Sequence, residues 1–211
     1  PLSGPFVSFV VRDEAGEIGA CADLAVHGWG AEVDGVTTAA SHRGRGYGDA
    51  LLVACLEAAT EHGKEVWVLD RPNPAGRPIE GLTLRAGWES FVGAGPIPMR
   101  HGLTMGELGQ WFIAHFNLDV KYRVIEMEGY APDTGPGFGW PQDRVWINPS
   151  PNAANVNMAR AYAGTVMVEG ATLSEGRGTT RPLEIFGAPD IDARAVIAKM
   201  HELAPHWLGG C

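Results

Sequence analysis

The sequence predicts an α/β protein in which a parallel or mixed sheet is flanked by helices and connected by long loops rich in glycine and proline. Three observations predict this class. Short apolar segments with strand character alternate with a longer segment of helical periodicity. The 29 glycines and 15 prolines interrupt the chain between these segments. With 211 residues, the chain can bury a sizeable core in one large domain or two small ones.

The first part of the chain reads as strands followed by a helix. Residues 6–12 and 18–26 alternate around a short turn and predict an antiparallel hairpin, and residues 31–38 predict a third strand. A glycine-rich segment then opens into an apolar-periodic helix from about residue 49 to 61, with Gly63 as its stop.

The middle of the chain predicts two strands around a second helix. Residues 65–70 (EVWVLD) predict a buried parallel strand, and the proline-rich residues after them predict an irregular loop. Thr104 and Glu107 form a capping-box pattern that predicts a helix to about Phe116. Residues 120–127 predict another strand, and the Gly-, Pro- and Trp-rich loop that follows is long enough to indicate a functional segment.

Near the end, residues 165–168 predict a short buried strand that leads into the stretch VEGATLSEGRGTTRPLEIFGAP (residues 168–189). Charged groups beyond a strand end are typical of ligand sites in α/β proteins, although a solvated turn-rich loop is the alternative. A last amphipathic helix is expected from about residue 192 to 203. Its predicted core residues are Ile191, Val196, Met200 and Leu203.

Composition limits the classes of partner. The net charge of −9 and the pI near 5.2 argue against a nucleic-acid or anionic-membrane surface. No apolar run reaches the length of a membrane span. Cys21, Cys55 and Cys211 support neither a disulfide framework nor a metal site, and they leave the compartment open. We therefore expect a small ligand, no metal and no cofactor.

A short resemblance covers the first quarter of the chain. The loop His42-Arg-Gly-Arg-Gly-Tyr-Gly48, with a strand before it and a helix after it, resembles the acyl-coenzyme A binding segment of the GNAT acetyltransferases. Such a loop offers backbone N–H groups and a helix N-terminus to a pyrophosphate. Residues 1–55 would form this segment. The resemblance implies acetyl-coenzyme A as an alternative cofactor, bound by Arg43, Gly44, Gly46 and Gly48.

A longer resemblance covers residues 56–211. Four motifs in order carry it: VLDRPNPAGRPIEG (68–81), SFVGAGPIPMRHGLTMGEL (90–108), WINPSPN (146–152) and AGTVMVEGATLSEGRGTTRPLEIFGAPDID (163–192). This part is similar to the bacterial exo-β-N-acetylmuramidase (NamZ) family of peptidoglycan glycosidases. The resemblance implies a Rossmann-like half followed by a smaller domain, and release of terminal N-acetylmuramic acid from the non-reducing end of muropeptides or other peptidoglycan-derived saccharides.

The sequence departs from the family pattern at both ends, so we expect an incomplete family fold that binds N-acetylmuramic acid weakly and hydrolyses its glycosides hardly at all. The family favours a periplasmic or secreted location, and a cytoplasmic one stays open. The alternative activity is that of a GNAT N-acetyltransferase.

Glycoside hydrolysis needs a proton donor and a second carboxylate. The candidate acids are Glu169, Glu175 and Asp70. At the end of a buried strand, Glu169 would have a raised pKa suited to a general acid, whereas Arg177 would keep Glu175 ionised. The alternatives are structural. Asp70 would pair with Arg71 or cap a turn, and Glu175 would fix its own loop.

Arginine and amide side chains are the candidates for binding substrate. An arginine fork matches the lactyl carboxylate of muramic acid bidentately. His101 is a candidate acid, base or hydroxyl partner, or a satisfied loop histidine. The candidate binding residues are Arg71, Asn73, Arg100, Asn152, Arg177 and Arg181. Trp140 and Trp146 either stack on sugar faces or anchor loops. We expect Asp70, His101, Glu169 and Arg177 to converge on one cleft.

Overall fold

A computed structural model describes residues 6–12, 15–16, 18–27, 30–38, 47–89, 93–133, 140–141 and 143–208. The chain divides into two compact units, Pro1–Val145 and Trp146–Cys211. No helix in the described ranges is both long and apolar enough to cross a membrane.

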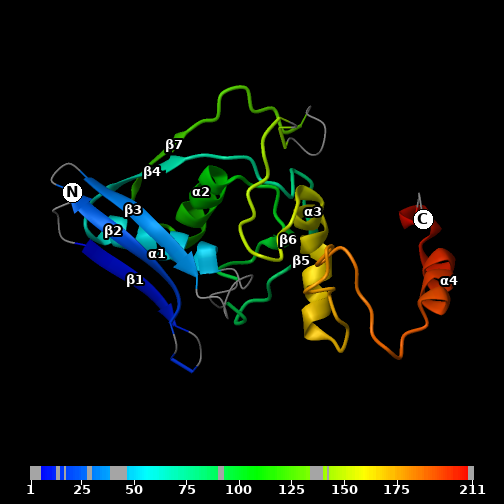
Figure 1. Ribbon diagram of the computed structural model, residues 1–211. Helices are drawn as coiled ribbons and strands as arrows, with labels where there is room; N and C mark the ends of the chain where they lie inside the picture. The colour runs from blue at the N-terminus through cyan, green and yellow to red at the C-terminus, as the bar shows by residue number, and fades with distance from the viewer. Residues whose placement is uncertain are drawn as a thin grey trace. The chain divides into compact units, whose positions relative to one another are not determined.

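The first unit begins with an antiparallel sheet, as the sequence predicts. Strands β1 (Phe6–Arg12), β2 (Ile18–His27) and β3 (Gly30–Thr38) lie side by side in that order (Figure 1). Helix α1 (Tyr47–Glu61) follows and contacts β1 and β2. Gly63 ends the helix in the left-handed region, with φ of 59°, so the predicted stop is confirmed.

A parallel strand pair and a second helix complete this unit. Strand β4 (Glu65–Leu69) pairs in parallel with β7 (Lys121–Ile125), which confirms the predicted α/β class. Between them in sequence lie β5 (Glu80–Thr83), β6 (Pro98–Arg100) and helix α2 (Met105–Phe116). The core forms where α1 meets α2, around the buried Leu56, Leu108 and Phe112.

The prediction that residues 65–70 form a buried strand is wrong for one face of β4. Val66 packs against the core, but Trp67 is 58% exposed and Leu69 is 81% exposed. Successive side chains of a strand point to opposite faces, and among the described residues the helices cover only one face of the β4–β7 pair. On the other face, the Arg123 guanidinium lies 4.9 Å from the centre of a Trp67 ring.

The second unit contains α3 (Val156–Thr165), the 3₁₀ helix η3 (Val166–Gly170), α4 (Ala193–Leu203) and the 3₁₀ helix η4 (Pro205–Trp207). The predicted strand at residues 165–168 is therefore wrong. The Asn155 side chain accepts a hydrogen bond from the Met158 amide and so caps the start of a helix. This helix continues through the apolar run and tightens into η3. A small core of Ala153, Met158 and Leu183 lies beside α3.

Helix α4 begins where the sequence predicts, because Asp192 accepts from the amides of Arg194 and Ala195 as its N-cap. Its predicted core is wrong. No residue of α4 is buried, and Leu203 is 71% exposed. An amphipathic pattern predicts an apolar face but does not specify what covers it.

Candidate functional site

The predicted site residues belong to both units. Asp70, Arg71, Asn73, Arg100 and His101 lie in the first unit. Asn152, Glu169, Glu175, Arg177 and Arg181 lie in the second. Their convergence on one cleft stays a prediction, and each group is described within its own unit.

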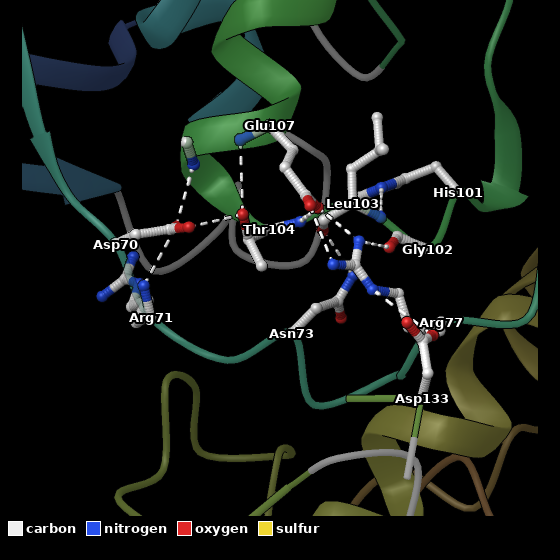
Figure 2. A network of polar contacts seen from close by, with 11 residues as sticks. Asp70, Arg71, Asn73, Arg77, His101, Gly102, Leu103, Thr104, Glu107 and Asp133 are labelled. Carbon is white, nitrogen blue, oxygen red and sulfur yellow. Dashed lines mark hydrogen bonds and ion pairs between the residues drawn. The ribbon is translucent and has the colours of Figure 1, made fainter. Parts of the chain in front are cut away.

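Asp70 follows β4 and accepts three hydrogen bonds at the start of α2 (Figure 2). The Thr104 hydroxyl donates to it at 2.6 Å, the Gly106 amide at 2.9 Å and the Arg71 amide at 3.0 Å. A carboxylate is favourable there because the first amides of a helix lack helical partners and the helix dipole is positive at that end. These contacts support the turn-capping role for Asp70, and its catalytic role stays a prediction.

The capping box of α2 is part of a larger ion-pair network. Thr104 and Glu107 exchange the reciprocal side-chain to backbone bonds that the sequence predicts. Arg77 adds a bidentate pair with the Glu107 carboxylate, at 2.5 and 2.8 Å, and donates to the Gly102 carbonyl at 3.1 Å. The Arg77 hydrogen bonds hold the pKa of Glu107 below its ordinary value. Sequence reasoning missed Arg77, since its partner lies 30 residues away.

Asn73 connects the loop after β4 to the segment before α2. Its amide nitrogen donates to the Leu103 carbonyl at 2.8 Å, and its amide oxygen accepts from the Ala75 amide at 2.9 Å. Both ends of this side chain are therefore engaged in holding loops.

His101 lies half-buried in the same network. Its Nδ1 accepts from the Leu103 amide at 3.0 Å. Burial lowers the pKa of its imidazole, against a smaller opposing effect of the Glu107 charge. His101 is therefore neutral near pH 7.

Two of the candidate arginines in the first unit differ in their contacts. Arg100 pairs with Glu80 at 2.5 Å across the β5–β6 strand pair. The guanidinium of Arg71 is exposed at the carboxyl end of β4 and forms no ion pair with a described residue. Among the candidates, Arg71 is the one whose charge is available to a ligand.

The glycine-rich stretch of the second unit forms a closed loop. Ser174 and Gly187 exchange two backbone hydrogen bonds, at 2.8 and 3.0 Å, and the Leu183 amide donates to the Glu175 carbonyl at 2.7 Å. Gly176 has φ of 75°, and a Cβ there would lie 2.9 Å from the Ile185 carbonyl oxygen. Glycine is thus required beside Glu175.

Arg177 lies between the two candidate glutamates of this loop. It pairs with Glu169 at 2.8 Å and with Glu175 at 2.6 Å. A hydrogen bond from the backbone of Glu175 itself, followed by the Arg177 contact, lowers the pKa of Glu175, in line with the sequence prediction. Glu169 lies in η3 and not at the end of a buried strand, so the desolvation expected there lacks its structural basis. Its side chain is 38% exposed, against 14% for Glu175.

These ion pairs affect the prediction that Arg177 and Arg181 bind the lactyl carboxylate of the substrate. Arg177 faces two carboxylates, and Arg181 pairs with Glu184, which also accepts from Asn155. A further anion would meet no net positive charge at either arginine. Asn152 lies half-buried beside this region and bonds no described residue. Trp146 donates to the Ala153 carbonyl at 2.8 Å, which is the contact of a loop anchor.

The ion pairs of this loop predict a loss of stability in acid. The pKa of Glu175 and that of Glu184 are both lowered, the latter by the Arg181 and then the Asn155 hydrogen bonds. Their contribution is present above the ordinary glutamate pKa of about 4.3 and is lost as pH falls through the lowered folded-state values. We expect the thermal midpoint to fall between pH 5 and 3, and Glu184→Gln to flatten that fall by about 2–4 °C.

Glu202→Gln is the matched control for this pH series. It removes a carboxylate from the exposed pair with Lys199 and should leave the curve unchanged. A wild-type midpoint that does not change over this range would contradict the prediction.

The remaining site predictions concern the coenzyme loop. Arg43, Gly44 and Gly46 lie outside the described residues, and Gly48 lies in the first turn of α1. Within the described ranges, no group of three or more His, Cys, Asp or Glu side chains gathers as a metal ion would require.

Comparison with known families covers both groups of site residues. The N-terminal model of exo-β-N-acetylmuramidase NamZ matches residues 47–157, and the C-terminal model matches residues 160–211. The chain belongs to the NamZ family. All candidate catalytic acids and substrate-binding arginines, from Asp70 to Arg181, therefore lie within one of the two matched ranges.

Individual relatives support the assignment to the NamZ family. The peptidoglycan β-N-acetylmuramidase NamZ of Bacillus subtilis is 39% identical over 154 residues, which are 72% of this chain and 36% of that protein. Two crystal structures of DUF1343 family proteins from Bacteroides fragilis match with a TM-score of 0.61 each. Their identities are 32% and 30%, over 70% and 75% of this chain and 41% and 42% of theirs. The chain thus spans about a third of the length of the curated NamZ relative.

A GNAT acetyltransferase model also matches, over residues 2–78. Residues 47–78 fall in both the GNAT and the NamZ range, and they include α1 and β4. The prediction of a GNAT-like beginning and a NamZ-like remainder is confirmed. The proposed boundary between residues 55 and 56 stays a prediction.

Proposed function

We propose that this protein is a peptidoglycan glycosidase that releases terminal N-acetylmuramic acid from the non-reducing end of muropeptides and related saccharides. The observation that carries the proposal is the match of both NamZ models, together with 39% identity to a peptidoglycan β-N-acetylmuramidase. The carboxylate pair of the second unit supports it, because glycoside hydrolysis needs two acids in different roles.

The contacts of the pair suggest how the two roles divide. Glu175 accepts from Arg177 and is ionised at neutral pH, as a nucleophile or a water-activating base must be. Glu169, the second acid of the pair, is assigned the role of proton donor to the leaving oxygen, and Arg177 holds it in place at 2.8 Å. In this assignment Arg177 positions both carboxylates and does not bind substrate.

Recognition of the lactyl carboxylate is then assigned to Arg71. Its guanidinium is exposed at the carboxyl end of a parallel strand, where ligands bind in α/β sheets, and it lacks an ion pair within the described chain. The neighbouring Asp70 carboxylate accepts a hydrogen bond of 3.0 Å from the Arg71 amide and so holds the Arg71 backbone. The Arg71 side chain therefore extends from a backbone that is held in place.

Calorimetry with three ligands tests the proposed function. N-acetylmuramic acid should bind, and N-acetylglucosamine, which lacks the lactyl carboxylate, should bind more weakly. Equal affinity for the two sugars would contradict specific recognition of muramic acid. If the protein binds neither sugar, the proposed function is wrong. Acetyl-coenzyme A is the third ligand, because the GNAT match over residues 2–78 favours an N-acetyltransferase as the second candidate function. Micromolar binding of acetyl-coenzyme A would support that candidate.

Arg71→Ala is expected to weaken binding of N-acetylmuramic acid about 10- to 100-fold, the range of a charge-assisted hydrogen bond. Affinity for N-acetylglucosamine should change little. Arg85→Ala is the matched control, because it removes another exposed arginine of the same unit and should leave both affinities unchanged. If the two variants behave alike, Arg71 does not bind the carboxylate.

A further inference from the structure

The segment around His101 is held in one conformation from several sides. Arg77 donates to the Gly102 carbonyl, and Asn73 donates to the Leu103 carbonyl (Figure 2). Gly102 has φ of 71°, and a Cβ there would lie 2.3 Å from the Arg77 carbonyl oxygen. The turn that carries His101 therefore has little freedom to rearrange.

This fixed turn determines which ring nitrogen of His101 carries the proton. The Leu103 amide donates to Nδ1 at 3.0 Å, so Nδ1 must present a lone pair. A proton on Nδ1 would place two donors face to face. In the neutral ring the proton therefore lies on Nε2, and within the described chain no residue accepts it.

We propose that His101 is a hydrogen-bond donor to the saccharide through Nε2–H, held in that tautomer by the Leu103 amide. The acceptor would be an uncharged oxygen of the sugar, such as a ring hydroxyl or the carbonyl of the N-acetyl group. His101 is then a specificity residue and not a general base, since the nitrogen that has a lone pair is already occupied. This inference rests on the proposed function for its ligand but not for its tautomer.

Nitrogen NMR tests the tautomer without any ligand. In ¹⁵N-labelled protein at pH 7, the His101 ring should show an unprotonated Nδ1 and a protonated Nε2. The chain has seven histidines, so the signal is assigned by its loss in His101→Asn and His101→Gln. A protonated Nδ1, in either the neutral or the charged ring, would overturn the inference.

Two variants separate the donor from the loop contact. In His101→Asn, the side-chain oxygen can still accept from the Leu103 amide, as in an Asx turn, but the Nε2–H donor is lost. In His101→Gln, the amide NH₂ reaches toward the position of Nε2, while the Nδ1 contact is lost. We expect His101→Asn to keep the thermal midpoint and to bind N-acetylmuramic acid about tenfold more weakly. His101→Gln should show the opposite pattern.

The outcomes distinguish this inference from the proposed function. If wild-type protein binds N-acetylmuramic acid and His101→Asn binds it equally well, the donor role is overturned while the proposed function stands. If wild-type protein does not bind the sugar, the proposed function and the donor role both fall. The tautomer is decided by the NMR result in either case.

Discussion

Gly102→Ala is expected to destabilise the first unit by about 2–4 kcal/mol. A left-handed conformation costs an L-residue roughly 1–2 kcal/mol, and inserting a methyl group into a packed site costs about 1–3 kcal/mol. The new Cβ would lie 2.3 Å from the Arg77 carbonyl oxygen, so the backbone of one of the two loops must move. That movement also separates Arg77 from the Gly102 carbonyl and strains its pair with Glu107.

Gly63→Ala is the control that isolates the close contact. Gly63 has φ of 59°, but no atom lies within 4 Å of a Cβ built there. Its replacement should therefore cost only the left-handed strain, about 1 kcal/mol. Urea denaturation followed by tryptophan fluorescence measures both variants. Equal losses would show that the contact between the two loops contributes nothing to stability.

The parts of the fold that depend on local sequence could be predicted. The capping box at Thr104, the stop at Gly63 and the start of the last helix near residue 192 each use atoms within a few residues, and all three occur as the sequence indicates. The hairpin and the parallel strands also follow from periodicity. Features that depend on contacts between nearby residues can therefore be predicted from the sequence alone.

The predictions that failed depend on what a segment packs against. Residues 165–168 are apolar enough for a strand, yet the helix that starts at Asn155 continues into them. Trp67 and Leu203 have the spacing of core residues, but within the described chain neither is covered. Periodicity gives the apolar face of an element and not its partner.

Prediction of the candidate site was limited because its residues pair with partners that lie far away in the sequence. The residue types were recognised, but Asp70 is bonded by Thr104 and Gly106, which lie 34 and 36 residues away. Of the four candidate arginines, Arg100, Arg177 and Arg181 already pair with glutamates. No spacing rule indicates the pair of Arg100 with Glu80, which lie 20 residues apart. Which charges remain available to a ligand is therefore a property of the folded chain.

Glu175→Gln and Glu169→Gln are each expected to lower the rate of glycoside hydrolysis about 10²- to 10⁴-fold, because one removes the ionised carboxylate and the other the proton donor. The measurement is release of nitrophenol from a nitrophenyl N-acetylmuraminide. High protein concentration and incubation over hours make a slow wild-type rate measurable.

Glu184→Gln is the matched control for these two variants. Glu184 lies in the same stretch, pairs with an arginine and has a lowered pKa, but it belongs to the Arg181 pair and not to the Arg177 pair. If the Arg177 pair performs the chemistry, Glu184→Gln should keep the wild-type rate within a few-fold while losing a similar amount of stability. Equal loss of rate in all three variants would instead mean that the carboxylates only hold the loop between Ser174 and Gly187 in place. In that case the acids that cleave the substrate must be sought elsewhere in the chain.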